Sequence, residues 1–249
     1  MKKILFYAMT LAFCFNPYIQ SQVKKTPFFS DLSDYPDQFQ FALNTGYSKQ
    51  IFPGLFYKSY NTPQSHQDFV KNISNGFYNE IDFSYYFKRF KTIGIGIKYS
   101  KSFCGASASD ISYDAENIPV IGGNLEQSMN YGFFGPQFSV RVLFLKNNMF
   151  YSKIAFGSVY FNQHTISSNN LLTRDFTIKS NTFGLNFEFA YDYFISKHLA
   201  LGIHGSFTAG AFFDYTLYEN SIKSYQQFGD ENELLISPLD IGVGLRYNF

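Results

Sequence analysis

The feature that most restricts the fold of this chain is a strict alternation of apolar and polar residues. It is clearest near the C-terminus, where every second residue is apolar: Leu239, Ile241, Val243, Leu245, Tyr247 and Phe249. The residues between them are Asp240, Gly242, Gly244, Arg246 and Asn248. Because successive side chains of a β-strand point to opposite faces, this pattern predicts strands with one apolar and one polar face.

The alternation recurs along the chain and predicts an all-β fold of eight strands. The expected strands cover 38–52, 77–88, 92–104, 128–145, 149–163, 178–195, 199–218 and 234–249. The connections between these strands alternate between short basic turns, such as Lys88 to Lys91, and long polar segments. We expect the long segments, at 53–76, 105–127, 164–177 and 219–233, to be loops. This arrangement is typical of an antiparallel up-and-down transmembrane β-barrel, which has short periplasmic turns and long extracellular loops.

The composition favours a membrane protein. Aromatic residues make up 21% of the 249 residues and charged residues only 16%, whereas soluble domains have about 25% charged residues. The chain has no run of 18 apolar residues long enough for a transmembrane helix, so a closed barrel is the remaining way to cross a bilayer. The net charge of +1 offers no basic stripe, and we therefore expect no nucleic-acid partner.

A soluble eight-stranded barrel of lipocalin type is the alternative fold, with the apolar face inside. The interior of an eight-stranded barrel is only just wide enough for its own side chains. It cannot hold this many Phe and Tyr rings, whereas the residues of the opposite face are small or polar, such as Gly94, Gly202 and Gly244. We therefore expect the apolar face to contact lipid and the polar face to line a narrow lumen.

Residues 1–21 have the features of a cleaved signal peptide. Lys2 and Lys3 precede an apolar run that is too short for a transmembrane helix, and Ser21 provides a small residue for cleavage. Cys14 follows a bulky residue, which disfavours lipoprotein processing.

Export then leaves a short periplasmic segment at 22–37 and one barrel domain at 38–249. The mature chain retains a single cysteine, Cys104, so no intrachain disulfide can form. We expect this thiol to be buried or to lie in a loop.

The pattern resembles the small outer-membrane β-barrels of diderm (Gram-negative) bacteria, the eight-stranded kind that includes the OmpA transmembrane domain and OmpX. The most specific part of the resemblance is the alternation of Leu245, Tyr247 and Phe249, which is similar to the family's C-terminal assembly signal. The resemblance implies insertion by the barrel assembly machinery and contact with outer-membrane lipid and lipopolysaccharide. The family includes structural proteins, adhesins, pores and a few enzymes, so it selects no function.

The alternation also assigns charged residues and one histidine to the lumen. These residues are Glu80, Asp82, Lys98, Arg141, Lys153, Glu188, Asp192, His204, Asp214, Asp240 and Arg246. Charges inside a narrow barrel are costly unless they are paired or hydrated. We therefore expect an ion-pair network that plugs the lumen. The alternative is a narrow porin-like channel for ions or small solutes, in which these residues set the ion preference.

The expected role is structural or one of surface interaction. The alternation at 199–218 is longer than a membrane strand requires, which predicts strands that protrude outward. A protruding sheet edge with long loops can bind an extracellular surface partner.

A lipid-modifying enzyme is the second alternative. His66 near Asp68, and His164 near Ser167, provide the types of group that hydrolases use. Neither spacing matches a known motif of barrel enzymes, so we expect no catalytic residues. We also expect no cofactor and no metal, because the sequence has no closely spaced His and Cys set.

Overall fold

The structure is a computed structural model that describes residues 38–51, 64–115, 118–144, 147–168, 172–220, 222–227 and 234–249. The expected signal peptide at 1–21 and the expected periplasmic segment at 22–37 lie outside the described residues.

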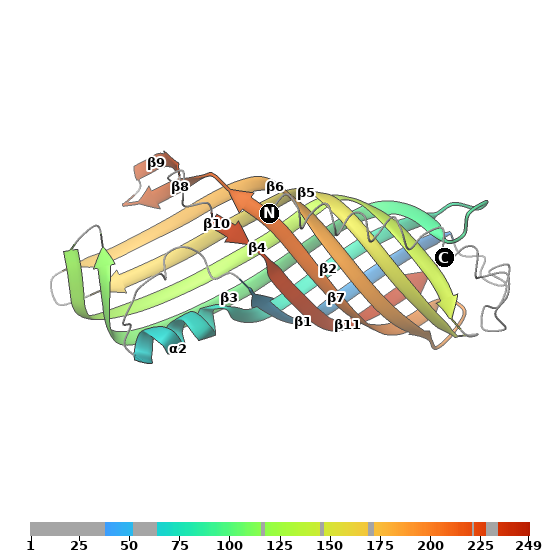
Figure 1. The fold of residues 1–249 in the computed structure, drawn as a ribbon, viewed down its shortest axis with the longest axis horizontal. Coiled ribbons are helices and arrows are strands. Elements are labelled where there is room, and N and C mark those ends of the chain that lie inside the picture. Colours follow the sequence, from blue (N-terminus) through green and yellow to red (C-terminus); the bar gives the residue numbers. More distant parts are fainter. Residues whose placement is uncertain are drawn as a thin grey trace, which may run out of the picture.

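Eight strands form a closed antiparallel ring around a lumen (Figure 1). They are β1 (Phe39–Gln50), β2 (Asn75–Tyr86), β3 (Ile93–Ala115), β4 (Ile118–Phe144), β5 (Asn148–Ser168), β6 (Thr173–Phe194), β7 (Leu199–Phe212) and β11 (Pro238–Asn248). Consecutive strands pair with each other, and β11 closes the ring by pairing with both β7 and β1. The all-β, up-and-down barrel that the sequence predicts is confirmed.

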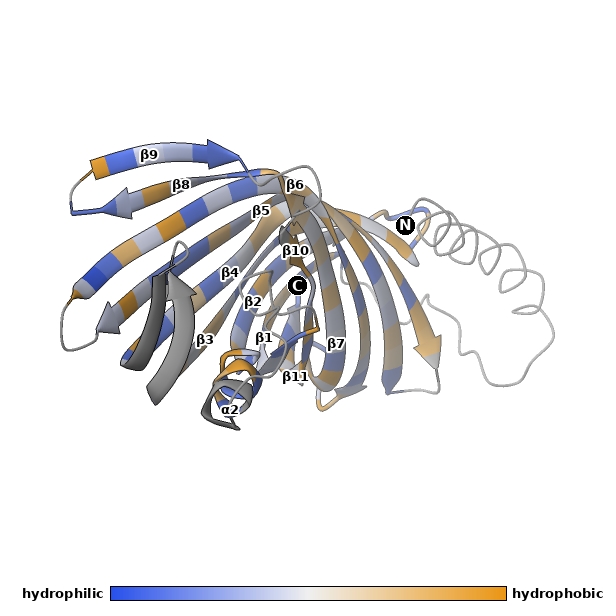
Figure 2. Ribbon diagram, turned by 60° about the vertical axis from the view of Figure 1, so that its left-hand side comes forward, coloured by the Kyte–Doolittle hydropathy of each residue, from blue (hydrophilic) through white to orange (hydrophobic). Residues whose placement is uncertain are grey.

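The ring is apolar outside and polar inside. Residues of β1 alternate between exposed and buried positions, and Figure 2 shows the same alternation as orange and blue bands along the ring strands. The exposed positions carry large apolar side chains, of which Phe183 and Phe189 on β6 are each 68% exposed. Because charged side chains such as Lys98, Glu188 and Arg246 are buried inside the ring while the large apolar side chains are exposed, this arrangement is that of a lipid-facing barrel and the reverse of a lipocalin.

The outward apolar band has the height of a bilayer core. On β6 it runs from Phe183 to Tyr193, a length that matches the ~9–11 residues of a membrane strand. Further along the same face of β6 come Asn181 and Lys179, which are polar. The part of β6 beyond the band therefore extends into water.

Four strands are much longer than a membrane strand, and they form a sheet that projects from one end of the ring (Figure 1). β3 has 23 residues, β4 has 27, β5 has 21 and β6 has 22. The expectation of loops at 105–127 and 164–177 is therefore wrong, since most of both segments lies in paired strands. The outward face there carries polar residues such as Glu126, and the inward face mixes buried polar and apolar residues, so the hydrophobic alternation fades although backbone pairing continues. We call this projecting part of β3 to β6 the outer sheet.

Smaller elements flank the outer sheet. They are α2 (Gln64–Ile73), β8 (Asp214–Glu219), β9 (Ile222–Gln227) and β10 (Leu234–Ile236). β8 pairs with the outer part of β6, and β9 pairs with β8. The ranges 53–76 and 219–233, expected to be loops, thus contain α2 and β9. No helix among the described residues is long and apolar enough to cross a membrane.

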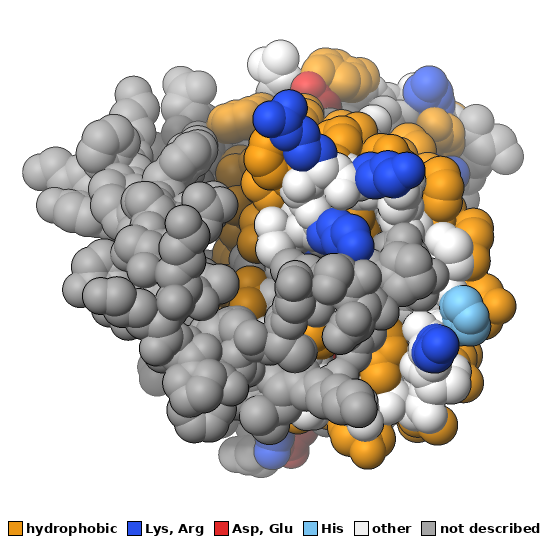
Figure 3. Space-filling view, turned by 90° about the vertical axis from the view of Figure 1, so that its right-hand side faces the viewer, with side chains coloured by type: hydrophobic (Ala, Val, Ile, Leu, Met, Phe, Trp, Pro, Cys, Tyr) orange, Lys and Arg blue, Asp and Glu red, His pale blue; other side chains and the backbone are white. Residues whose placement is uncertain are grey.

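The opposite end of the ring carries the tight turns. Phe90 donates a backbone hydrogen bond to Phe87 (3.0 Å) in the turn after β2, and Ser196 donates one to Leu199 (3.1 Å) in the turn after β6. Figure 3 views this end directly and shows Lys and Arg side chains gathered on it, with hydrophobic side chains around them. The two basic turns that the structure describes in full therefore lie at the end remote from the outer sheet.

A glycine on the outer surface accommodates an aromatic ring. Gly132 on β4 lies opposite Tyr160 on β5, and a Cβ atom at Gly132 would be 1.7 Å from Cζ of Tyr160. The Tyr160 hydroxyl donates a hydrogen bond of 3.0 Å to the hydroxyl of Tyr99 on β3. The aromatic side chain of Tyr160 on β5 thus covers the exposed backbone at Gly132 on β4 and, through its hydroxyl, also contacts β3.

Candidate functional site

The centre of the lumen holds a network of ion pairs that crosses the barrel. Lys98 Nζ lies 2.9 Å from Glu80 Oε2 and 2.7 Å from Glu188 Oε2. Lys153 Nζ lies 2.7 Å from Asp82 Oδ2 and 3.3 Å from Glu188 Oε1. Because these residues belong to β2, β3, β5 and β6, the pairs connect opposite walls of the ring.

Arg246 on the closing strand β11 completes the network. Its Nη2 donates a hydrogen bond of 3.1 Å to Glu188 Oε1, and its Nη1 donates to Asp192 Oδ1. Glu188 is therefore the centre of the network, since it contacts Lys98, Lys153 and Arg246. The side chains of these ion pairs are all at most 1% exposed. Buried charges are tolerated in proteins when each one has a partner of opposite sign, as here.

Neutral polar side chains bind two further carboxylate oxygens of the network. Asn44 Nδ2 donates to Glu80 Oε1 at 2.7 Å, and Gln137 Nε2 donates to Asp82 Oδ1 at 3.2 Å. Small residues on the wall make room for them, since a Cβ atom at Gly244 would be 1.9 Å from Asn44 Oδ1. These contacts hold the carboxylates in fixed positions rather than leaving them free to move.

An apolar cluster closes the lumen at the tight-turn end. We call it the turn-end cluster, and its residues are Tyr86, Leu143, Met149, Tyr151, Ala190, Phe194 and Ala200. Arg141 lies here rather than in the ion-pair network: its guanidinium is 3.7 Å from the centroid of the Tyr86 ring, and its Nε donates to the Lys91 carbonyl at 2.8 Å. Arg141 therefore fastens the turn after β2 to the wall.

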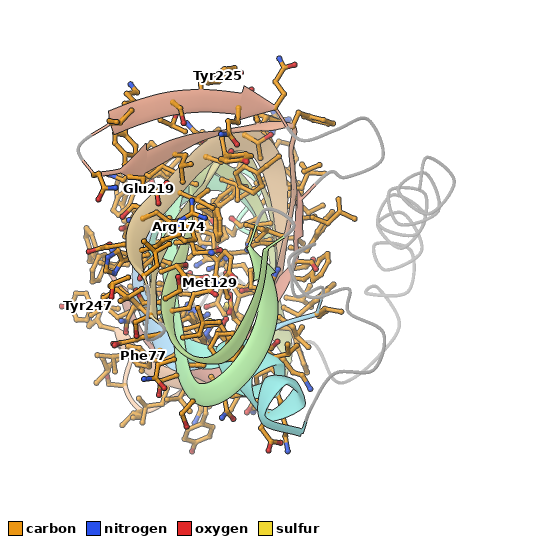
Figure 4. The ribbon with its side chains drawn as sticks, turned by 90° about the vertical axis from the view of Figure 1, so that its left-hand side faces the viewer. Phe77, Met129, Arg174, Glu219, Tyr225 and Tyr247 are labelled. Carbon is orange, nitrogen blue, oxygen red and sulfur yellow. The ribbon has the colours of Figure 1, made fainter. Side chains whose placement is uncertain are left out.

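A larger apolar cluster closes the lumen at the outer end. This outer cluster consists of Phe69, Ile73, Cys104, Met129, Tyr131, Phe133, Ala155, Val159, Phe161, Ile178, Phe212 and Ile236. Figure 4 looks into this end and shows Met129 near the centre, whereas Phe77 and Tyr247 lie at the outside. α2 contributes Phe69 and Ile73, and β10 contributes Ile236. Elements outside the ring thus help to fill its outer opening.

Little space remains between the network and the outer cluster. The pocket lined by Ser102, Phe133, Thr208 and Asp240 has a volume of about 10 Å³, roughly that of one water molecule. The hydroxyls of Ser102 and Ser206 each donate to Asp240, both at 3.4 Å. Among the described residues, the ion-pair network and the two apolar clusters therefore occupy the centre and both ends of the lumen.

The predicted lumenal residues fall into three groups. The structure joins Glu80, Asp82, Lys98, Lys153, Glu188, Asp192 and Arg246 in one network. Arg141, His204 and Asp240 are buried but have other partners. The placement of Asp214 in the lumen is wrong, because β7 ends at Phe212 and Asp214 begins β8 outside the ring.

His204 is buried against Tyr78, whose hydroxyl contacts its Nε2. Donor atoms of His204, Glu80 and Glu188 all lie within 4.8 Å of one another, which is a spacing that suits a metal ion. The ammonium of Lys98 already bonds to both carboxylates, however, and its positive charge disfavours a metal ion at this position. No spacing in the sequence predicts this grouping, because its members are on three different strands.

The candidate enzymatic pairs do not form a site. His164 on β5 is exposed and lies 2.8 Å from Asp175, whereas Ser167 is buried on the other face of the same strand. The side chain of His66 lies outside the described part of the chain, and Asp68 is exposed on α2. A nucleophile and a base therefore do not meet at His164 and Ser167.

The alternation missed the residues that seal the two ends of the lumen. Met129, Tyr131 and Phe133 share the inward face of β4 with Gln137, and the same parity that places the charges in the lumen also places these three there. The outward position of Phe138 on β4 therefore predicts that Met129, Tyr131 and Phe133 face the lumen. The alternation does not predict that α2 packs against these residues.

No family model and no curated protein matches the sequence. Solved structures match the fold. A major outer membrane protein from Thermus thermophilus has a TM-score of 0.50 and 13% identity, and the match covers 86% of this chain and 100% of that one. The outer membrane protease OmpT from Escherichia coli has a TM-score of 0.49 and 9% identity, with 91% and 100% covered. The outer membrane protein OprG from Pseudomonas aeruginosa has a TM-score of 0.44 and 10% identity, with 87% and 98% covered.

At sequence identities this low, a structural match indicates a common fold and not a common activity. The closed ring, its apolar outer band and the likeness to the Thermus protein agree with one another. The fold of this chain is that of a small outer-membrane β-barrel.

Proposed function

We propose that the protein is a non-conducting, non-enzymatic barrel of the outer membrane that holds the outer sheet at the cell surface. The observation that carries this proposal is the filled lumen, in which the ion-pair network lies between the turn-end cluster and the outer cluster. An open pore needs a continuous path of water, and two apolar clusters in series oppose such a path.

The outer sheet supports a role in surface interaction. It begins where the apolar band ends, at Asn181 on β6, and its outward side chains include His164, Asp175 and Lys179. Extended strands that rise from a rigid barrel can present a fixed surface or a sheet edge to a partner. The partner we propose is an extracellular molecule that contacts the outer sheet.

The proposed orientation in the membrane rests on the same features. Small outer-membrane barrels have short periplasmic turns and long extracellular segments, which supports a periplasmic location for the tight turns. Leu245, Tyr247 and Phe249 are exposed on the outside of the ring. This exposure supports their proposed role as the signal read by the barrel assembly machinery, with lipid and lipopolysaccharide as the later neighbours of the band.

Conductance in a planar bilayer tests the proposal. A heat-dependent shift on a gel first establishes that the purified mature protein is a folded barrel. We expect a folded protein that gives no discrete current steps. Reproducible steps that change when Glu188 or Lys98 is neutralised would overturn the proposal in favour of a narrow channel.

Surface display is tested by epitope tags in intact cells. A tag inserted at 169–171, between β5 and β6, should bind antibody without permeabilisation. A tag next to Lys197, between β6 and β7, should bind antibody only after the outer membrane is opened. The reverse result would contradict the orientation and with it the surface role.

A further inference from the structure

The tight-turn end of the barrel differs in charge from the outer end. Lys88, Arg89 and Lys197 are exposed there, and Lys91 is partly exposed. Among the side chains that the structure describes, every Asp or Glu that is not buried lies at the other end, on α2, the outer sheet or β8: Asp68, Glu126, Asp175, Asp214 and Glu219. Among the described side chains, exposed carboxylates therefore lie only at the outer end, whereas exposed cations lie at both ends, with Lys179 and Lys223 at the outer one.

An aromatic patch lies between the two basic turns. β11 and β1 separate β7 from β2 in the ring, and their ends carry Phe249 and Phe39, whose ring centroids are 5.8 Å apart. Tyr85 lies 5.0 Å from Phe39, and Tyr247 lies 6.0 Å from Phe249. Aromatic rings of this kind mark the boundary of a bilayer, where headgroups begin. The cations of the turns therefore lie at the depth of lipid phosphates.

The backbone holds these cations in place. The turn after β2 is fixed by the bond of Arg141 Nε to the Lys91 carbonyl and by the bond of the Arg141 amide to Thr92 (2.8 Å). The turn after β6 is fixed by Ser196, whose Oγ accepts hydrogen bonds from the amides of His198 (3.3 Å) and Leu199 (3.1 Å). Charges on rigid turns lose less conformational freedom when they bind.

We propose that this end of the barrel binds the headgroups of anionic phospholipids in the adjoining leaflet. Lys88, Arg89 and Lys197 attract the lipid phosphates, and the patch of Phe39, Tyr85, Tyr247 and Phe249 receives the upper parts of the acyl chains. The proposal rests on the proposed insertion in the membrane, and it adds a lipid class and a binding surface to it.

Lipid selectivity measured with spin-labelled lipids tests this inference. The mature protein is reconstituted in phosphatidylcholine vesicles that contain trace spin-labelled phosphatidylglycerol or, in parallel, spin-labelled phosphatidylcholine. We expect the anionic label to associate about fivefold more strongly, the effect of roughly one cation near a charged lipid surface. The preference should fall as salt is added.

Two triple variants locate the effect. K88Q/R89Q/K197Q should reduce the preference to about that of phosphatidylcholine. The matched control K101Q/K179Q/K223Q removes three cations elsewhere and should keep the preference. An unchanged preference in the first variant, or an equal loss in the second, would overturn the inference. A protein that shows the heat-dependent gel shift but no preference would refute the lipid site and leave the proposed barrel intact, whereas a protein without the gel shift would refute both.

Discussion

The centre of the lumen and its outer end are both filled, but with opposite kinds of side chain. The centre consists of ion pairs around Glu188, and every charge there comes from a ring strand. The outer cluster consists of apolar side chains, and α2 and β10 supply part of it. One ring thus encloses two interiors that depend on different forces, electrostatic pairing in one and apolar packing in the other.

This difference predicts different responses to substitution. A charge network fails when one member is removed, because its partners remain buried without compensation. An apolar cluster loses stability roughly in proportion to the volume removed and to how well its surroundings can close in. Variants of single residues in each region therefore separate the two kinds of interior.

The largest effect is expected for Glu188→Gln. The substitution leaves Lys98, Lys153 and Arg246 without their shared carboxylate, and it should lower the free energy of unfolding by about 3–5 kcal/mol. Urea unfolding in lipid vesicles, followed by the heat-dependent gel shift, measures it. Asp175→Asn is the control, because Asp175 is exposed and its pair with His164 should contribute less than about 1 kcal/mol. Equal effects of the two variants would contradict a special role of the network.

A smaller loss is expected for Met129→Ala in the outer cluster. It should cost about 2 kcal/mol, the lower end of the usual range, because α2 is not part of the ring and can move into the space. The same unfolding assay applies. Phe183→Leu, on the lipid side, serves as the control and should change stability less. A loss as large as that of Glu188→Gln would mean that the outer cluster is as rigid as the network.

Gly132→Ala tests side-chain packing on the outer surface of the barrel, which surrounds both the ion-pair network and the outer cluster. The added methyl group displaces the ring of Tyr160 and breaks its bond to Tyr99, at a cost of about 1–2 kcal/mol. Gly105→Ala is a matched control, since the nearest atom to its Cβ would be the Gln127 carbonyl oxygen at 3.6 Å. Should both variants be equally stable, the ring of Tyr160 does not stabilise the wall.

The smallest effect is expected at β8, outside both interiors. Arg174 binds both carboxylate oxygens of Glu219, at 2.8 and 3.0 Å, and this pair lowers the pKa of Glu219 below its usual value. A lowered pKa means that the pair stabilises β8 above the ordinary pKa of Glu and that this contribution disappears as the pH falls through the lowered pKa.

Hydrogen exchange of the β8 amides checks this pH dependence. Arg174→Gln should speed exchange at neutral pH and make little difference in strong acid, where Glu219 is protonated. We expect at most about 1 kcal/mol, because the pair is partly exposed to solvent. Exchange that is equally fast at neutral pH with and without Arg174 would show that the pair does not hold β8.

The sequence predicts the ring well because the outward band alternates so strictly. Ring strands carry large apolar residues on their outward face, most regularly on β6 from Phe183 to Tyr193, and this parity fixes which face meets lipid. The charged residues of the network follow from the same parity. Their actual partners do not, because Glu188 meets Lys98 only after the ring has closed.

The sequence predicts the outer sheet poorly for a physical reason. Beyond the band the outward face is solvated, and the inward face includes buried polar residues such as Gln127 and Thr165, so neither face shows a clear hydrophobic period. The end of β7 at Phe212 is equally hidden, because Phe213 and Tyr215 continue the apolar parity although the backbone leaves the ring. The misplacement of Asp214 follows directly from that continued parity.

The position of Arg246 on β11 has a consequence for the order of assembly. β11 is the strand that seals the ring, and until it docks, Glu188 and Asp192 lack the guanidinium that they share in the finished barrel. Docking of β11 against β7 therefore also brings the neutralising charge to the two carboxylates of β6.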